Sequence, residues 1–140
     1  MKLLNPTFIV VLVAFTLLSC NTHVSEDTKS TNLVSEGVHV YYFHNTTRCV
    51  TCLAVEKETK MVLEVFYSDE MKEGDIEFIA LNLEEQNGKE IAELFKVAGQ
   101  ALLLVKGDAQ VNLINEGFMN ARTNPEKFHE ILKTQIEKLL

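Results

Sequence analysis

Two cysteines separated by two residues, Cys49 and Cys52, constrain the fold of this 140-residue chain more than any other feature. They follow an apolar, aromatic run at residues 38–43 and precede an amphipathic segment that reaches Phe66. A strand that leads into a Cys-x-x-Cys at the start of a helix is typical of thiol–disulfide redox sites. The unpaired N–H groups and positive dipole end of a helix N-terminus favour a thiolate. The pattern therefore predicts a redox-active pair.

The helix that follows predicts different environments for the two cysteines. Three- and four-residue spacing places one stripe towards the core, formed by Cys52, Val55, Thr59, Val62, Leu63 and Phe66. Cys49 falls at the mouth of this helix, about one turn before Cys52. We therefore expect Cys49 to lie at the surface and Cys52 to point inward, so that the two sulfurs have different roles.

The N-terminus resembles a bacterial lipoprotein signal peptide. Lys2 precedes an apolar run at residues 8–18, and residues 17–20 (Leu-Leu-Ser-Cys) match a lipobox. The apolar run is about 11 residues long, whereas a membrane-spanning helix needs ~20. The resemblance implies cleavage before Cys20 and lipidation of its sulfur. The alternative is a buried cysteine at the end of an ordinary signal peptide or signal anchor.

Composition divides the chain into three parts. We expect a signal peptide at residues 1–19, a polar flexible tether at residues 20–37 and one domain at residues 38–140. The resemblance to a lipoprotein leader implies that the domain lies in the bacterial cell envelope, facing the periplasm or the cell exterior, where a disulfide can persist. Contact with the membrane is expected only through the acylated Cys20.

The charge of the chain excludes one class of partner. The net charge is -7, and all 20 acidic residues follow Cys20. Nucleic-acid binding depends on Lys and Arg that neutralise phosphates, so no nucleic-acid partner is expected. The sequence also contains no Gly-rich phosphate loop for a flavin, and we expect no cofactor.

The remaining pattern predicts an α/β domain. Strands are expected at residues 38–44, 76–83, 101–105 and 110–115, the last two as a hairpin. Residues 69–75 are expected to form a turn. A short helix after Gly88 should turn Ile91, Leu94 and Phe95 inward, and a final helix should begin at Pro125 with Asn124 as its N-cap. A mixed central sheet of about four strands, flanked by helices, would accommodate this order.

This order of elements, with Cys-x-x-Cys between the first strand and first helix, resembles the thioredoxin fold over residues 38–140. That resemblance implies a three-layer sandwich in which Cys49 is the attacking thiolate and Cys52 the resolving thiol. It also implies client protein thiols or disulfides and an electron-transfer partner as its partners. Residues 40–44 and 48–56 are in addition similar to bacterial proteins of the nitrophenyl compound nitroreductase subunit ArsF family.

Several residues near the cysteines are candidates for tuning them. We expect Arg48, the helix N-terminus and His44 to stabilise the Cys49 thiolate. The first strand has no counterpart of the buried Asp of thioredoxin, and Glu56 is the nearby carboxylate that fits this role. A glutamate on an amphipathic helix is, however, more often a solvated surface residue.

The loop opposite the cysteines also departs from the thioredoxin pattern. The cis-Pro of that fold would fall at Gly99, Gln100 and Ala101, where no proline occurs. Cis peptide bonds are nearly confined to proline, so we expect this substrate loop to be trans and differently shaped.

Two further functions remain open. Cys49 and Cys52, with His44 or His39, are a candidate site for a soft metal or metalloid, although closed zinc sites usually have four protein ligands. The oxidoreductase hypothesis itself requires no metal. Alternatively, a Cys49–Cys52 disulfide stiffens the helix start of a structural or partner-binding lipoprotein. His39 is otherwise expected to be an ordinary strand residue, and His129 a surface residue.

Overall fold

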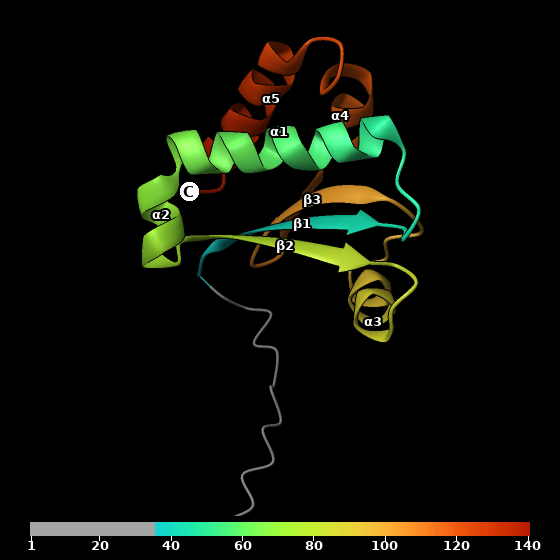
Figure 1. The fold of residues 1–140 in the computed structure, drawn as a ribbon. Coiled ribbons are helices and arrows are strands. Elements are labelled where there is room, and N and C mark those ends of the chain that lie inside the picture. The colour runs from blue at the N-terminus through green and yellow to red at the C-terminus, as the bar shows by residue number, and fades with distance from the viewer. Residues whose placement is uncertain (1–35) are drawn as a thin grey trace, which may run out of the picture. The chain divides into compact units, whose positions relative to one another are not determined.

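The computed structural model describes residues 36–140, which form four strands and five helices (Figure 1). The expected signal peptide, Cys20 and all but the last two residues of the expected tether lie outside these residues. In chain order the elements are β1 (Val38–His44), α1 (Val50–Phe66), α2 (Ser68–Glu73), β2 (Ile76–Asn82), α3 (Gln86–Leu94), β3 (Ala101–Lys106), β4 (Ala109–Asn112), α4 (Ile114–Asn120) and α5 (Pro125–Glu137).

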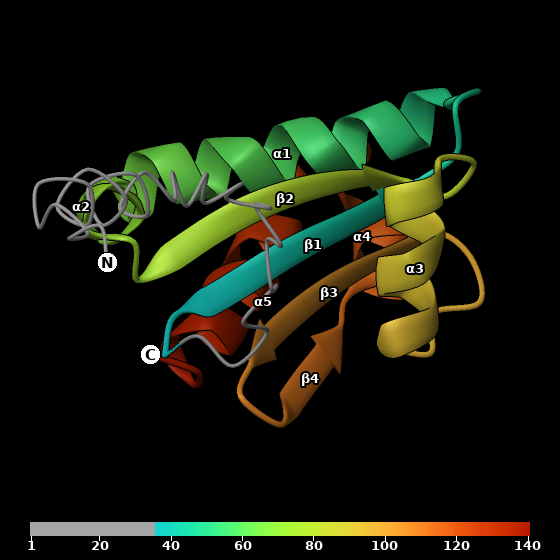
Figure 2. The same ribbon diagram turned by 90° about the horizontal axis from the view of Figure 1, so that it is seen from below.

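The four strands form one mixed sheet in the order β2-β1-β3-β4 (Figure 2). β1 runs parallel to β2 and antiparallel to β3, and β4 closes a hairpin with β3. Val40 illustrates the register, because it lies opposite Phe78 on one side and Leu104 on the other. The predicted fold class is confirmed: the domain is an α/β sandwich of the thioredoxin-like kind.

Successive residues of β1 enter two separate apolar cores. Val40 and Tyr42 lie in the larger core, beneath α1, α4 and α5, together with Val55 and Phe128. Tyr41 and Phe43 lie in the smaller core beneath α3, together with Leu81, Ala92 and Leu103. Figure 1 shows this arrangement, with α1, α4 and α5 over one face of the sheet and α3 over the other. Coverage of both faces explains the continuous apolar run of this strand.

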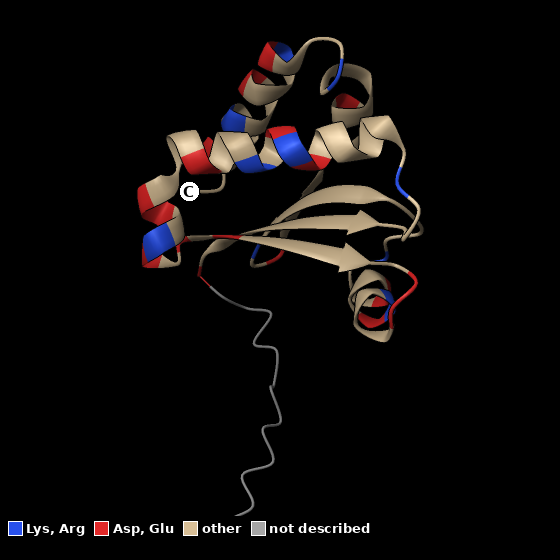
Figure 3. Cartoon of the chain, viewed as in Figure 1, with Lys and Arg blue, Asp and Glu red and all other residues tan. Residues whose placement is uncertain are grey.

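Charged residues are concentrated on the helices, while the strands have few of them (Figure 3). This distribution is typical of a sheet whose two faces are both covered. None of the helices in residues 36–140 is long and apolar enough to cross a lipid bilayer.

The predicted start of α5 is confirmed, whereas the boundaries of two other segments were predicted wrongly. Asn124 caps α5, and its side chain accepts a hydrogen bond from the Lys127 N–H at 3.4 Å. The predicted strand at residues 110–115 ends at Asn112, and the short helix α4 follows it. The predicted turn at residues 69–75 contains α2, a helix of six residues.

Two predictions about side-chain burial were also wrong. Phe66 and Leu94 were expected to point inward, but they are 52% and 53% exposed. The ring of Phe66 instead lies 4.3 Å from the Lys133 ammonium, an arrangement that stabilises an exposed ring through a cation–π contact. α3 begins at Gln86, before Gly88, and turns Ala92 inward.

His129, expected at the surface, forms a largely buried contact with Glu58 between α1 and α5. Its Nε2 lies 2.8 Å from a carboxylate oxygen of Glu58, and the two side chains are only 15% and 9% exposed. Burial alone would raise the pKa of Glu58. Hydrogen bonds and charges from Lys57 and His129 outweigh burial and hold that pKa below its usual value.

Acid is expected to weaken the fold through Glu58. Because its pKa in the folded protein is depressed, the contribution of Glu58 to stability is complete above the unfolded-state pKa of about 4.3 and is lost as the pH falls through the folded-state pKa. We expect Glu58→Gln to lose about 1–3 kcal/mol of unfolding free energy at pH 7. Below pH 5, the unfolding free energy of this variant should depend less on pH than that of the unmodified protein does.

Urea unfolding at a series of pH values from 7 to 3 measures both effects. Glu64→Gln, which removes an exposed carboxylate from the same helix, is the matched control and should change little. Equal stability and equal pH dependence in Glu58→Gln and Glu64→Gln would show that the pair with His129 does not stabilise the fold.

Candidate active site

The loop between β1 and α1 is held in place by the loop between β2 and α3. The Leu83 N–H donates to the carbonyl of His44 at 2.8 Å, which extends the parallel ladder by one bond. The Asn82 side-chain amide donates to Thr46 Oγ1 at 2.9 Å, and the Thr46 N–H donates to a carboxylate oxygen of Glu84 at 3.2 Å. These contacts fix the position at which α1 begins.

Cys49 and Cys52 form a disulfide at the start of α1, with their Cα atoms 5.1 Å apart. Cys49 is the N-cap of the helix and is exposed, whereas Cys52 is 3% exposed. The Cys52 N–H donates to Cys49 Sγ at 3.1 Å, so a backbone donor of the first helical turn is directed at the sulfur of the more exposed cysteine. The predicted difference in exposure between the two cysteines is confirmed, while their different roles stay a prediction.

Tyr42 joins the first turn of α1 to the central strand. Its hydroxyl donates a hydrogen bond to the carbonyl of Cys52 at 2.8 Å. Burial raises the pKa of Tyr42, although Arg48 opposes this shift, so the phenol stays protonated and remains a donor. We did not predict this role. The sequence did contain a signal for it. Tyr42 lies on the same face of the strand as Val38 and Val40, which predicts that its ring is buried, and a buried phenol needs a hydrogen-bond partner.

Arg48 lies beside the cysteines but its guanidinium pairs with Glu56. The guanidinium carbon also lies 5.4 Å from the centre of the Tyr42 ring. Glu56 in turn accepts a hydrogen bond from Lys60 at 2.6 Å. The charge of Arg48 is therefore compensated by a carboxylate, and its predicted action on Cys49 stays a prediction.

Glu56 is not the solvated surface residue that its helical position suggested, because its side chain is only 15% exposed. Burial alone would raise the pKa of Glu56, but hydrogen bonds and charges from Lys60 and Arg48 lower it below its usual value. A carboxylate with a lowered pKa does not readily hold a proton near neutral pH. The Glu56 carboxylate instead pairs with the Arg48 guanidinium and holds it in place.

The two histidines of β1 have partners of their own. His44 Nδ1 lies 3.0 Å from the Asn45 carbonyl oxygen, and its ring lies 5.8 Å from that of Tyr42. The predicted effect of His44 on Cys49 stays a prediction. His39 is a strand residue, as expected, and its Nδ1 lies 3.4 Å from Glu77 on the adjacent strand.

The metal-site hypothesis receives no support from this arrangement. Within residues 36–140, no group of three or more His, Cys, Asp or Glu side chains is placed to hold a metal ion. The ligand set of Cys49, Cys52 and His44 is therefore not assembled here.

Gln100 lies against the buried sulfur of the disulfide. Its Oε1 is 3.3 Å from Cys52 Sγ, and its side chain is directed there by the loop that leads into β3. All peptide bonds of the described residues, including those of this loop, are trans. Ala101 is buried at the start of β3 opposite Phe43, and Gly99 is exposed. A disulfide sulfur has no proton, whereas a Cys52 thiol could donate to Gln100.

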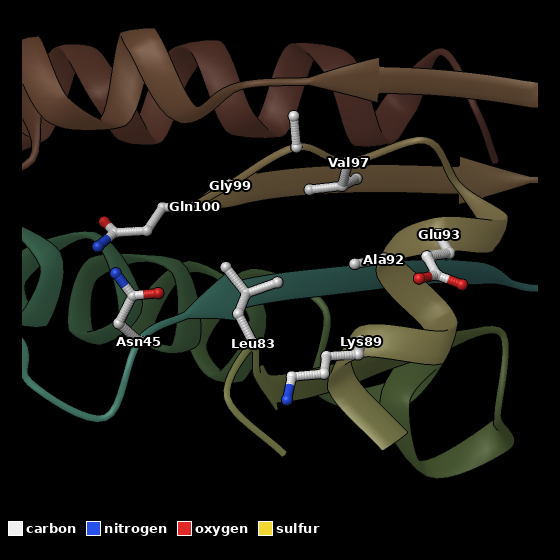
Figure 4. Close-up of a pocket in the computed structure, with 9 residues that line it drawn as sticks. Asn45, Leu83, Lys89, Ala92, Glu93, Val97, Gly99 and Gln100 are labelled. Atoms are coloured by element: carbon white, nitrogen blue, oxygen red, sulfur yellow. The ribbon is translucent and has the colours of Figure 1, made fainter. Parts of the chain in front are cut away.

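A pocket of about 440 Å³ opens on the side of Gln100 that faces α3 (Figure 4). It is formed by four separate segments, and its lining residues are Asn45, Leu83, Lys89, Ala92, Glu93, Val97, Ala98, Gly99 and Gln100. We predicted Gly99 and Gln100 from the sequence but not the other lining residues. No local pattern identified them, because only the folded chain brings these segments together.

No family model and no curated protein matches this chain. Among solved structures, one described as "Structure of a malarial protein" is similar, with 16% sequence identity and a TM-score of 0.46. The match covers 71% of this chain and 96% of that one. The function is therefore inferred from the geometry and chemistry of the site itself.

Proposed function

We propose that the protein is a thiol–disulfide oxidoreductase that uses Cys49 and Cys52 as its redox pair. The observation that carries this proposal is the unequal placement of two bonded sulfurs. Cys49 is an exposed residue at the N-cap of α1 and its Sγ accepts a hydrogen bond from the Cys52 N–H, while Cys52 is buried. The lipobox pattern supports anchoring through Cys20 in the bacterial cell envelope, where client proteins carry disulfides.

From the disulfide state, the reaction begins when a thiolate of a client dithiol attacks Cys49 Sγ. A bond between the client sulfur and Cys49 forms as the Cys49–Cys52 bond breaks, and Cys52 Sγ leaves with the electron pair and takes up a proton. The second client thiol loses its proton and attacks the client sulfur of this mixed disulfide. Cys49 is released as a thiolate, so two electrons have passed from client to protein. The reverse sequence reduces a client disulfide.

The helix terminus supplies the stabilisation that this scheme needs. A thiolate on Cys49 would accept the same Cys52 N–H that now reaches its sulfur and would lie at the positive end of the α1 dipole. Burial of Cys52 confines attack by a client to Cys49. The two sulfurs therefore do not compete for the client.

A structural disulfide is the second candidate function. The Arg48–Glu56 pair favours it, because a compensated guanidinium contributes less to lowering the pKa of a neighbouring thiol. In that case the bond would only stiffen the start of α1, and Cys49 would not be activated.

Alkylation of the reduced protein distinguishes these functions. With the helix terminus acting on it, Cys49 should react with iodoacetamide with a half-maximal rate between about pH 3.5 and 7.5, below the value of about 8.5 for a free cysteine. Cys52 should be spared because it is buried. Peptide mass mapping after pulses at several pH values locates the modified sulfur, and Cys49→Ser provides the background. A Cys49 that reacts only above about pH 8 would favour the structural disulfide.

A further inference from the structure

An ion pair encloses the disulfide along the chain. Arg48 directly precedes Cys49, and Glu56 lies four residues after Cys52, in the second turn of α1. The Arg48 guanidinium pairs with the Glu56 carboxylate, and the two side chains are only 20% and 15% exposed. The pair therefore joins the loop residue before the N-cap to the body of the helix, with both cysteines between its two ends.

Tyr42 fixes the other cysteine from the side of the sheet. Its hydroxyl donates to the Cys52 carbonyl at 2.8 Å, which ties the buried cysteine to β1. The Arg48 guanidinium carbon lies 5.4 Å from the centre of the same ring, a distance at which a cation is attracted to the ring. Cys52 is thus fixed by the strand, and the residue next to Cys49 is fixed by the ion pair.

We propose that Arg48 and Glu56 are positioning residues that keep Cys49 beside Cys52 when the disulfide is reduced. This inference rests on the proposed redox function, and it adds to that function a contact that sets the equilibrium between the dithiol and the disulfide. Neither residue reacts with a client. Their contact acts through the backbone of the loop that carries Cys49.

Closing the disulfide requires an ordered loop before α1. When the S–S bond is broken, the chain at Cys49 can gain conformational freedom, and this freedom is lost again when the bond forms. An ion pair that already holds Arg48 against the helix lowers this entropy cost, so it raises the effective concentration of one thiol near the other. The pair therefore favours the disulfide and makes the reduction potential more negative.

A purely electrostatic action of Arg48 predicts a different result. An uncompensated cation beside Cys49 would stabilise its thiolate, which favours the reduced form and makes the potential less negative. The charge of Arg48 is, however, compensated by Glu56. Removing both charges of the pair at once leaves their sum unchanged. A change in the potential then reports the position of the loop and not its charge.

The full-length Arg48→Met/Glu56→Gln protein provides this test. Methionine is unbranched and can still lie over the Tyr42 ring, while glutamine keeps an acceptor for Lys60, so the substitutions remove the ion pair with little change in volume. The protein is equilibrated with glutathione at pH 7, where two glutathione thiols become one glutathione disulfide as the protein disulfide becomes a dithiol. Alkylation and peptide mass mapping give the reduced fraction of the pair.

We expect the disulfide of this variant to be at least fivefold less stable relative to glutathione. This change corresponds to a potential about 20 mV less negative, since a tenfold change is about 30 mV. Asp69→Asn/Lys72→Met removes an exposed ion pair of α2 by the same chemical change and should leave the equilibrium constant within twofold. A change smaller than fivefold in Arg48→Met/Glu56→Gln, or an equal change in the control, would overturn the proposal.

The melting temperatures of both redox forms separate positioning from a general effect on stability. A pair that only stabilised the fold would stabilise the oxidised and reduced proteins equally, and its loss would leave the potential unchanged. We expect the oxidised protein to lose more stability than the reduced one. If the double variant does not fold, Arg48→Lys replaces it, because lysine keeps the charge without the planar fork of arginine. Its disulfide should be at least twofold less stable, and a smaller change refutes the assignment.

The potential of the unmodified protein separates this proposal from the proposed function. A potential in the range of redox-active pairs, with an unchanged value in the folded variant, would leave the redox function standing and remove the positioning role. A potential in the range of structural disulfides, with a fivefold shift in the variant, would remove the redox function. The pair would then stand as the support of a structural disulfide.

Discussion

Replacing Cys52 with serine is expected to trap the protein on its client as a persistent mixed disulfide. In the reduced Cys52→Ser protein, Cys49 still attacks a client disulfide, but position 52 no longer carries the resolving thiol that displaces the client. In the unmodified protein, Cys52 is held beside Cys49 and acts as an intramolecular nucleophile, an advantage that is commonly very large. We expect the lifetime of the adduct to rise by at least about a hundredfold.

Non-reducing mass spectrometry after mixing with an oxidised client peptide measures this adduct. Cys49→Ser is the matched control, and it should form almost none because Cys52 is 3% exposed. Adducts of equal abundance in the two variants would contradict the assignment of different roles to Cys49 and Cys52. The absence of any adduct in Cys52→Ser would contradict the exchange mechanism as a whole.

Gly88→Ala is expected to destabilise the domain strongly. A Cβ at this position would lie 1.9 Å from the backbone oxygen of Asn82 and 2.6 Å from its carbonyl carbon. The backbone at Asn82 cannot easily yield, because that oxygen accepts from the Glu85 N–H and the residue ends β2. Overpacking typically costs 1–3 kcal/mol and occasionally more, and a backbone clash this close should cost at least about 3 kcal/mol.

Thermal unfolding followed by circular dichroism measures this loss, which corresponds to a fall of roughly 10–20 °C in Tm. Gly99→Ala is the matched control, because no atom lies within 4 Å of the Cβ it would add and its φ is not positive. It should change the free energy of unfolding by less than about 1 kcal/mol. A Tm of Gly88→Ala within a few degrees of that of Gly99→Ala would show that α3 does not pack as closely on β2 as described.

The central strand and the unequal cysteines could be predicted because both depend on local periodicity. A continuous apolar run indicates a strand covered on both faces, and β1 enters two cores. The position of Cys49 before a helix and of Cys52 one turn later follows from 3.6 residues per turn. The start of the last helix could be predicted as well, since Asn124 and Pro125 are residues that favour a helix start.

α4 could not be predicted from the local sequence, because the glycine within it is explained only by a contact with another helix. Gly117 normally disfavours a helix interior. In the structure a Cβ there would lie 3.1 Å from a methyl carbon of Val55, so the glycine lets α4 approach α1 closely. The apolar and polar residues from Gln110 to Asn115 alternate only in part, and β4 ends at Asn112.

Two charged contacts were missed for a related reason. Glu58 and His129 are 71 residues apart in sequence, and each alone has the spacing of a surface residue on its helix. Arg48 was expected to act on the cysteine next to it, but its guanidinium pairs with Glu56. Periodicity identifies a helix face, whereas the partner of a charged side chain depends on which elements the fold brings together.

The reduction potential of the Cys49/Cys52 couple tests the proposed function most directly. Equilibration of the purified domain with glutathione or dithiothreitol buffers, followed by counting of alkylated thiols, gives this potential. If Cys49 is a thiolate stabilised by the start of α1, the potential should lie between about -270 and -120 mV, the range of redox-active pairs. A value below about -300 mV is typical of structural disulfides and would contradict the account.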